Sequence, residues 1–353
     1  MLQGNEAVLA LLRPLLGILE RPGVTELAVN RPGEVYIESD TGWERIEIPE
    51  MGAMHLRSMA AAIASFCKQT ISNTKPILSG TLPGKERVQI VLEPAVDAGQ
   101  ISFTIRRPDH RTKDLSEYTE ARLFDEAIWR CSDGDFESLT IPERQLTTKL
   151  QDRDFEGFFR QAVTERLNIC IVGDTGSGKT TLMKSLCAEI PRHERLITIE
   201  DVRELFMPNH GNQSNLLYVK DDQGLAKVSP SNLIASCMRM KPDRVLLAEL
   251  RGSESYDFLK LLTTGHAGSI TSFHAESCAR AIARFALMAK EHPEAAAYAV
   301  ADLKKLLFMT IDVIAHLSAK AVYDEHGNQT GKRRVMTELY FDPFKKRDLA
   351  YET

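Results

Sequence analysis

An eight-residue segment in the middle of the chain restricts the possible folds more than any other feature. Residues 173–180 read GDTGSGKT and match the pattern G-x-x-x-x-G-K-T at every fixed position. An apolar run at 167–172 precedes the segment, and 181–190 continues as a predicted helix that ends before Pro191. Glycines let backbone amides surround an anion, and a helix N-terminus adds positive potential. The segment therefore predicts a strand–loop–helix unit that binds phosphate.

The same loop indicates the ligand. In proteins with this loop the lysine contacts the β- and γ-phosphates of a nucleoside triphosphate, and the following hydroxyl binds Mg²⁺. We therefore expect ATP and Mg²⁺, with Lys179 at the phosphates and Thr180 at the metal. The residues predicted to bind the nucleotide are Gly173, Asp174, Thr175, Gly176, Ser177, Gly178, Lys179, Thr180 and Thr181.

Strand-like segments alternate with helical ones in the second half of the chain, which is typical of a largely parallel sheet. The expected strands are 167–172, 195–200, 244–249, 269–273 and 311–317. A late hairpin is indicated by Gly327-Asn328. The first half instead predicts short strands within 24–49, at 86–92 and at 100–107, with a helix at 54–70.

These patterns predict an α/β protein of two domains. We expect a mixed α/β, sensor-like N-terminal domain over 1–115, a linker over 116–145 and a RecA-like P-loop ATPase domain over 146–353. The boundaries follow the change in composition after Pro108 and the start of strand–helix alternation near 146.

Two acids and one histidine follow predicted strands. Acids at the carboxyl ends of strands near a P-loop hold the metal and orient the attacking water. Glu200 follows one such strand, and Glu249 follows another in which Ala248 occupies the usual aspartate position. Glu249 is therefore expected at the metal, and Glu200 is the first candidate for orienting water, with Glu249 as the second. His274 is expected near the γ-phosphate; solvated carboxylates and a structural histidine remain the alternatives.

Two arginines of the first domain form a further candidate site. If strands 86–92 and 100–107 pair as a hairpin with Val88 opposite Ile105, Arg87 lies opposite Arg106. Like charges in that position repel, by up to roughly 1 kcal/mol. We hypothesise that the γ-phosphate relieves this repulsion, so that ATP joins the two domains; two solvated arginines are the alternative.

Composition restricts the other possibilities. A formal net charge of −5 and a pI near 6.0 do not indicate direct nucleic-acid binding. The six cysteines form no C-x-x-C pair, so buried reduced thiols are expected rather than a zinc site. No membrane-spanning segment is predicted, and the apolar face within 7–19 fits a helix packed on protein, or on a membrane surface.

Four boxes in this order resemble the secretion-superfamily traffic ATPases, over roughly residues 75–340. They are GDTGSGKT at 173–180, IED at 199–201, PDR with LLAELRG at 242–252, and TGHAGSITSFHA at 264–275. The first domain is similar to the type IV secretion branch at 76–80, 86–92 and 101–108, and the cysteine element usual in type II enzymes is missing. The resemblance implies a homohexamer with nucleotide bound between the domains. It further implies a cytoplasmic protein, peripheral to the inner membrane, that works with other type IV secretion components.

Other functions stay open on sequence alone. Type II secretion or type IV pilus assembly is the alternative within the same class of motor. A small-molecule kinase and a nucleotide-gated scaffold without turnover are alternatives from other classes. The transported substrate, and whether one chain supplies both domains around a nucleotide, are left undecided.

Overall fold

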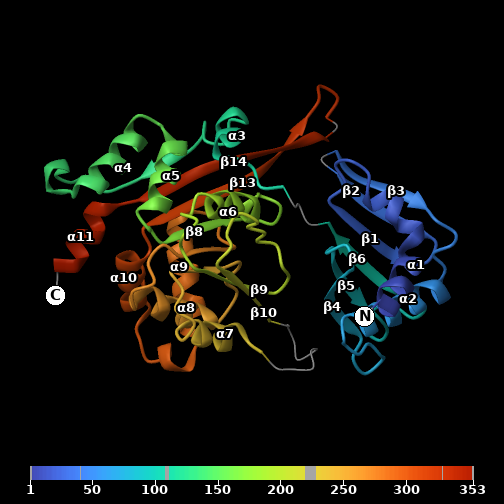
Figure 1. Ribbon diagram of the computed structural model, residues 1–353. Helices are drawn as coiled ribbons and strands as arrows, with labels where there is room; N and C mark the ends of the chain where they lie inside the picture. Colours follow the sequence, from blue (N-terminus) through green and yellow to red (C-terminus); the bar gives the residue numbers. More distant parts are fainter. Residues whose placement is uncertain (1, 40, 108–110, 219–227, 328, 352–353) are drawn as a thin grey trace.

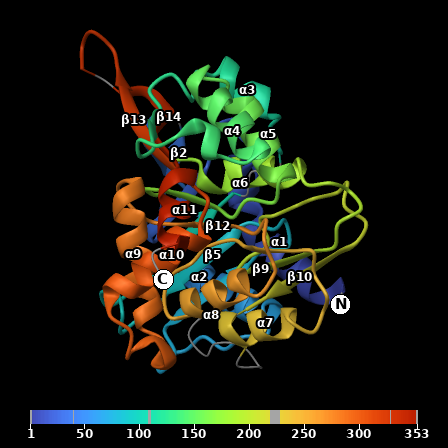
Figure 2. The same ribbon diagram turned by 90° about the vertical axis from the view of Figure 1, so that its left-hand side faces the viewer.

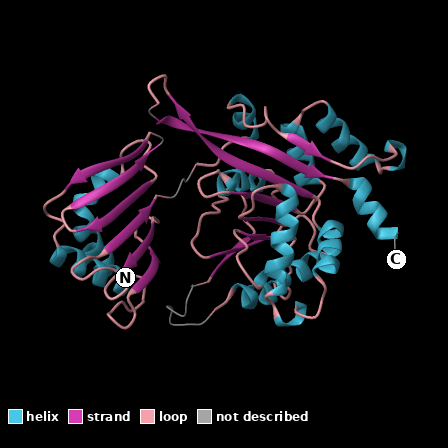
Figure 3. Cartoon of the chain, turned by 180° about the vertical axis from the view of Figure 1, so that it is seen from behind, coloured by secondary structure: helices cyan, strands magenta, loops and turns pink. Residues whose placement is uncertain are grey.

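Each of the two predicted α/β regions forms its own sheet. The computed structural model describes residues 2–39, 41–107, 111–218, 228–327 and 329–351. Figure 1 shows the N-terminal domain in blue and cyan beside a larger domain coloured green to red, and Figure 3 shows both from behind. Asn328, at the predicted hairpin turn, and 108–110, where the change in composition begins, lie outside the described residues.

The N-terminal domain contains a six-stranded antiparallel sheet in the order β3-β2-β1-β6-β5-β4. Its strands are β1 Glu26–Arg31, β2 Glu34–Ser39, β3 Gly42–Glu47, β4 Ile77–Thr81, β5 Arg87–Val91 and β6 Ser102–Arg106.

Two helices, α1 (Leu2–Leu19) and α2 (Ala53–Phe66), pack with this sheet in one hydrophobic cluster. Val8, Leu12 and Leu15 of α1 are buried in that cluster, so this helix face packs on its own domain. The central strands alternate buried and more exposed residues, as expected for a sheet with one covered face. The other face is therefore free to carry polar side chains.

The larger domain contains an eight-stranded sheet in the order β10-β9-β11-β12-β8-β13-β14-β7. Pairing is parallel from β10 to β13, and β13 pairs with β14 antiparallel. The strands are β7 Ile128–Arg130, β8 Ile169–Gly173, β9 Leu196–Glu200, β10 Gln213–Leu217, β11 Arg244–Leu247, β12 Ile270–Phe273, β13 Val313–Tyr323 and β14 Gln329–Phe341. All five strands predicted in this region are present, and the predicted α/β fold class is confirmed.

Helices cover both faces of this sheet, which explains why its central strands are continuously buried. Ile169 and Ile171 of β8 point into one hydrophobic cluster, whereas Cys170 and Val172 point into the other. The first cluster includes α3 Leu115–Glu120, α4 Ile141–Gln151, α5 Phe155–Thr164 and α6 Lys179–Ala188. The second includes α7 Pro230–Cys237, α8 Glu254–Thr263, α9 Cys278–Lys290 and α10 Val300–Thr310. Short 3₁₀ turns at Phe136–Ser138 and Pro293–Ala295 and the last helix, α11 Pro343–Tyr351, complete the elements.

We expected residues 116–145 to form a linker. In the structure this segment instead packs against the larger domain. Tyr118, Leu123 and Phe124 are buried in the same cluster as the P-loop helix, and β7 forms an edge of the large sheet. The sequence signal was present as a capping box at Asp114 and Glu117, which starts α3. Its apolar residues are too irregularly spaced to reveal this packing.

A long hairpin links the domains on one side. β13 and β14 extend past the body of the larger domain (Figure 2). Lys332 on β14 donates a 2.6 Å hydrogen bond to Glu38 on β2 of the N-terminal domain. The strand pair therefore positions the two domains around the space described next.

Candidate nucleotide site

The P-loop lies where β8 ends and α6 begins. Gly173 has φ 145°, and a Cβ at this position would lie 2.0 Å from the carbonyl oxygen of Leu317 on β13. Gly178 has φ 96° and caps the N-terminus of α6. Both positions require glycine, because side-chain residues rarely adopt these conformations. At Gly173 the loop therefore lies close to the backbone of β13, and the loop amides remain available to an anion.

Lys179 is the cation of the loop, and its surroundings shift its pKa. Its Nζ donates to the carbonyl oxygens of Gly173 (2.7 Å) and Asp174 (2.8 Å). Burial lowers its pKa to about 8, although the nearby Glu249 and Asp174 charges oppose this change. An ammonium group held at the loop by neutral carbonyls is well placed to bind phosphate oxygens.

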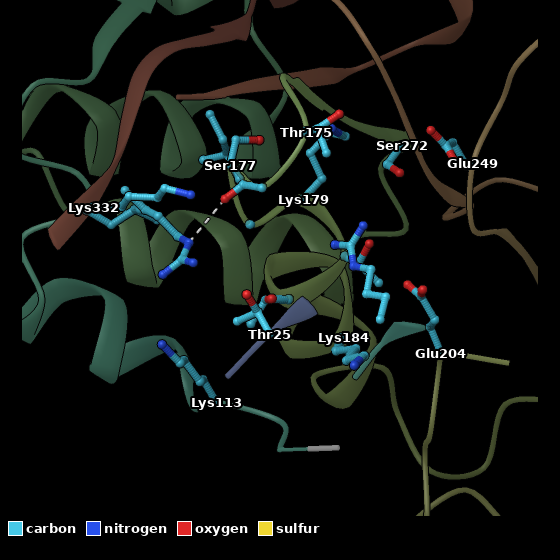
Figure 4. Close-up of a pocket in the computed structure, with 18 of the residues that line it drawn as sticks. Thr25, Lys113, Thr175, Ser177, Lys179, Lys184, Glu204, Glu249, Ser272 and Lys332 are labelled. Carbon is cyan, nitrogen blue, oxygen red and sulfur yellow. Dashed lines mark hydrogen bonds between the residues drawn. The ribbon is translucent and has the colours of Figure 1, made fainter. Parts of the chain in front are cut away.

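A cavity of about 830 Å³ lies over this loop and is lined by both domains of the chain. Figure 4 shows Thr25 and Lys113 on one side of it and Ser177 and Lys179 on the other. Among the described lining residues, ten are Lys or Arg and three are Asp or Glu. Such an excess of positive charge favours a polyanionic ligand.

The predicted register of the two arginines is confirmed. Arg87 on β5 pairs opposite Arg106 on β6, and both line the cavity. Arg87 Nη2 donates to Asp201 (2.8 Å) and Nη1 to Glu204 (3.1 Å), both from the larger domain. We expected a bound anion to relieve the repulsion between these arginines. In this structure the two carboxylates already compensate the charge of Arg87.

Glu249 and His274 lie together just beyond the carboxyl ends of β11 and β12. Glu249 Oε1 lies 3.2 Å from His274 Nε2, and Arg251 Nε donates to Glu249 Oε2 at 2.8 Å. Burial and the neighbouring Asp201 charge raise the pKa of Glu249. Burial, together with Lys179, lowers the pKa of His274.

Glu200 occupies a different place from the one expected for a water-orienting acid. It is fully buried and does not line the cavity. Its Oε2 accepts hydrogen bonds from the amides of Glu204 (2.7 Å) and Leu205 (2.9 Å), and Oε1 accepts one from Thr198 (3.0 Å). Its carboxylate thus fixes the loop that carries Asp201 and Glu204.

Several basic residues of the cavity were not assigned from sequence. Lys184 lies on α6, one helical turn after Thr180, so helical periodicity would have placed it on the cavity side. Arg107, Lys113 and Lys332 come from three other segments, and only the tertiary fold brings them to the cavity.

The residues present fit a nucleoside triphosphate with Mg²⁺. Gly176, where a Cβ would meet no atom within 4 Å, leaves room for phosphate at the loop, and Lys179 and the arginines supply positive charge beside it. Thr180 and Glu249, which provide the oxygen ligands that Mg²⁺ prefers, also line the cavity.

Comparison with known proteins agrees with this architecture. The chain is 41% identical over 343 residues to the type IV secretion system protein VirB11 of Brucella suis, covering 97% of this chain and 92% of that protein. It is 39% identical over 325 residues to the type IV secretion system protein PtlH of Bordetella pertussis, covering 92% of each chain.

Solved structures show the same relationship. The crystal structure of the VirB11 ATPase from the Brucella suis type IV secretion system in complex with sulphate is 42% identical, with a TM-score of 0.53, covering 97% of this chain and 99% of that chain. The Legionella pneumophila ATPase DotB is 16% identical with a TM-score of 0.59, covering 96% of this chain and 82% of that chain, and so shares the fold. The family described as "Type II/IV secretion system protein" matches residues 12–333. The chain therefore belongs to the Type II/IV secretion system protein family.

Proposed function

We propose that this protein hydrolyses ATP with Mg²⁺ and acts as the motor of a type IV secretion system. The observation that carries the proposal is the cavity between the domains, where the P-loop of one domain faces Arg87 and Arg106 of the other. A phosphate held there would contact both domains, so that its release could change their relative position.

The predicted residues that line the cavity each have a role in this proposal. Lys179, Arg87 and Arg106 stabilise negative charge on the transferring phosphoryl group. Glu249 orients the attacking water, because it lines the cavity and Glu200 does not. His274, which lies 3.2 Å from Glu249, couples loss of the γ-phosphate to movement of the domains.

The metal site uses the same carboxylate and one hydroxyl. Thr180 and Glu249 would hold Mg²⁺, directly or through water, and the ion would neutralise part of the phosphate charge. The backbone amides of 173–181 would orient the phosphates.

The cellular role rests on the relatives. Those described above at 39–41% identity carry the names of type IV secretion proteins, which favours this role over type II secretion or pilus assembly. We further propose a homohexamer attached peripherally to the cytoplasmic face of the inner membrane, next to other secretion components. Within the described ranges, no helix combines the length and apolarity that crossing a bilayer requires.

Phosphate release from ATP, measured without any acceptor substrate, tests the activity. We expect steady release that depends on Mg²⁺ and that Glu249→Gln abolishes. Phosphate release only with an added acceptor would indicate a kinase. If the parent chain and Glu249→Gln assemble equally and neither releases phosphate, the protein is a scaffold. The oligomeric mass, measured with and without ATP and Mg²⁺, tests the hexamer.

A second variant tests the contribution of the N-terminal domain. Arg106→Ala should reduce turnover with little change in ADP affinity, since ADP lacks the γ-phosphate. Arg57→Ala is the matched control, because Arg57 is an exposed arginine of α2 in the same domain and does not line the cavity. Unchanged turnover in Arg106→Ala would remove this role.

A further inference from the structure

Arg251 contacts two carboxylates at the edge of the cavity. Its Nε donates to Glu249 Oε2 at 2.8 Å, Nη2 contacts the same oxygen, and Nη2 lies 3.4 Å from Asp201 Oδ2. The loop that carries Arg251 is itself fixed, because Glu254 at the start of α8 accepts a 2.6 Å hydrogen bond from the Arg251 amide. The guanidinium therefore lies between Glu249 and Asp201 in a defined position.

Asp201 is shared between two arginines from different domains. The oxygen that lies 3.4 Å from Arg251 also accepts the 2.8 Å hydrogen bond from Arg87. Arg87 in turn contacts Glu204 at 3.1 Å. A continuous series of ionic contacts thus runs from Glu249 through Arg251 and Asp201 to Arg87, and crosses from the larger domain to the N-terminal domain.

This series contains more negative than positive groups, so the loss of a contact at one end changes the contacts at the other end. Three carboxylates share two guanidinium groups, and Asp201 makes its shorter contact with Arg87. If a γ-phosphate draws Arg87 away, Asp201 loses that contact, and Arg251 is already only 3.4 Å from the same oxygen. Movement of Arg251 toward Asp201 would weaken its contact with Glu249.

The contact with Arg251 matters for the role of Glu249. A carboxylate oxygen that accepts two hydrogen bonds from a guanidinium has less capacity to accept one from water. Glu249 Oε1 lies beside His274 and Oε2 beside Arg251, so both oxygens have neighbours in this structure. Release of Oε2 would leave an acceptor on the cavity side.

We propose that Arg251 is a positioning residue that transmits the position of Arg87 to Glu249 through Asp201. While Arg87 is paired with Asp201, Arg251 holds Glu249; when Arg87 moves to the γ-phosphate, Arg251 moves to Asp201 and Glu249 is free to orient water. No bond is made or broken in this exchange of partners. The inference rests on the proposed ATP hydrolysis and adds a link between domain contact and the catalytic carboxylate.

Steady-state kinetics of the full-length chain test the link. Asp201→Asn is expected to lower kcat about tenfold, with KM for ATP changing less than about twofold, because Arg251 then has no carboxylate to move to and stays on Glu249. In this Asp201→Asn background, Arg251→Met should restore most of the lost kcat, because it frees Glu249.

Two controls separate positioning from folding. Arg280→Met removes an exposed arginine that pairs with Glu276 on the larger domain, and should leave kcat unchanged. Arg251→Lys keeps the charge but offers one compact ammonium in place of a planar fork, so it should preserve the melting temperature and restore the kcat of Asp201→Asn less than Arg251→Met does.

The outcomes are distinguishable. An unchanged kcat in Asp201→Asn would overturn the proposal, as would a kcat that Arg251→Met does not raise in the Asp201→Asn background. A raised KM with unchanged kcat in Arg251→Met would show that Arg251 binds the nucleotide directly, and would also overturn it. If the unmodified chain releases no phosphate from ATP, the proposed function itself fails, which is visible before any variant is compared.

Discussion

Arg244 and Glu194 form a buried ion pair whose removal should destabilise the larger domain. Arg244, the first residue of β11, is fully buried, and Glu194 is 5% exposed. Two parallel hydrogen bonds of 2.8 Å join the guanidinium to the carboxylate, and Nη1 donates to the carbonyl of Val163 at 2.7 Å. The perturbation that we consider is Glu194→Gln, which removes the negative charge with little change in shape.

The expected loss follows from the burial. Leaving one charge of a buried pair uncompensated costs about 3–5 kcal/mol of unfolding free energy, whereas an exposed pair contributes at most about 1 kcal/mol. Arg244 keeps its bond to Val163, so we expect a loss of about 3 kcal/mol. The hydrogen bonds from Arg244 lower the pKa of Glu194, so its contribution is complete above the unfolded pKa of about 4.3 and disappears as pH falls through the lower folded pKa.

Urea unfolding followed by tryptophan fluorescence measures this loss. The chain has two tryptophans; Trp43 lies in the N-terminal domain, and Trp129 on β7 donates a 2.9 Å hydrogen bond to the carbonyl of Phe341. In a Trp43→Phe background the signal therefore reports the larger domain. The matched control is Glu276→Gln, which breaks the exposed pair with Arg280. A midpoint shift no larger than the control, with unchanged m-value, would refute the reasoning.

Two further predictions concern the P-loop. Because burial lowers the pKa of Lys179 to about 8 and a bound phosphate would raise it, ATP affinity should be greatest below pH 8 and fall by up to about tenfold per pH unit above it. Calorimetry at pH 8.5 in buffers of different ionisation enthalpy should show proton uptake, and Lys179→Arg should lose it. Gly173→Ala should abolish ATP binding by calorimetry and lower the melting temperature, because its Cβ would lie 2.0 Å from the Leu317 carbonyl; Gly211→Ala, where no atom lies within 4 Å, is the control.

Sequence patterns were most informative where local chemistry restricts the backbone. The apolar segment before the P-loop and the glycines at 173 and 178 identified β8, its turn and α6, because few other folds satisfy that pattern. The alternation in β5 and β6 predicted the pairing of Arg87 with Arg106, because a shift by one residue would expose the apolar face.

Predictions failed or stayed incomplete where contacts between distant segments decide the outcome. Glu200 follows its strand as predicted, but its orientation depends on amides four and five residues later, which turn its carboxylate away from the cavity. Residues 116–145 are polar enough to resemble a linker, yet a few buried apolar side chains pack the segment against the larger domain.

The amino-acid sequence by itself determined the P-loop, the succession of strands and helices along the chain and the pairing of Arg87 with Arg106. Each of these depends on residues that lie close together in the sequence. Only the tertiary structure decided that Arg87 meets Asp201 and Glu204, more than 100 positions away, and that Arg251 joins them to Glu249. Side-chain charges attract over a few ångströms of space, and the folding of two domains against each other sets those distances.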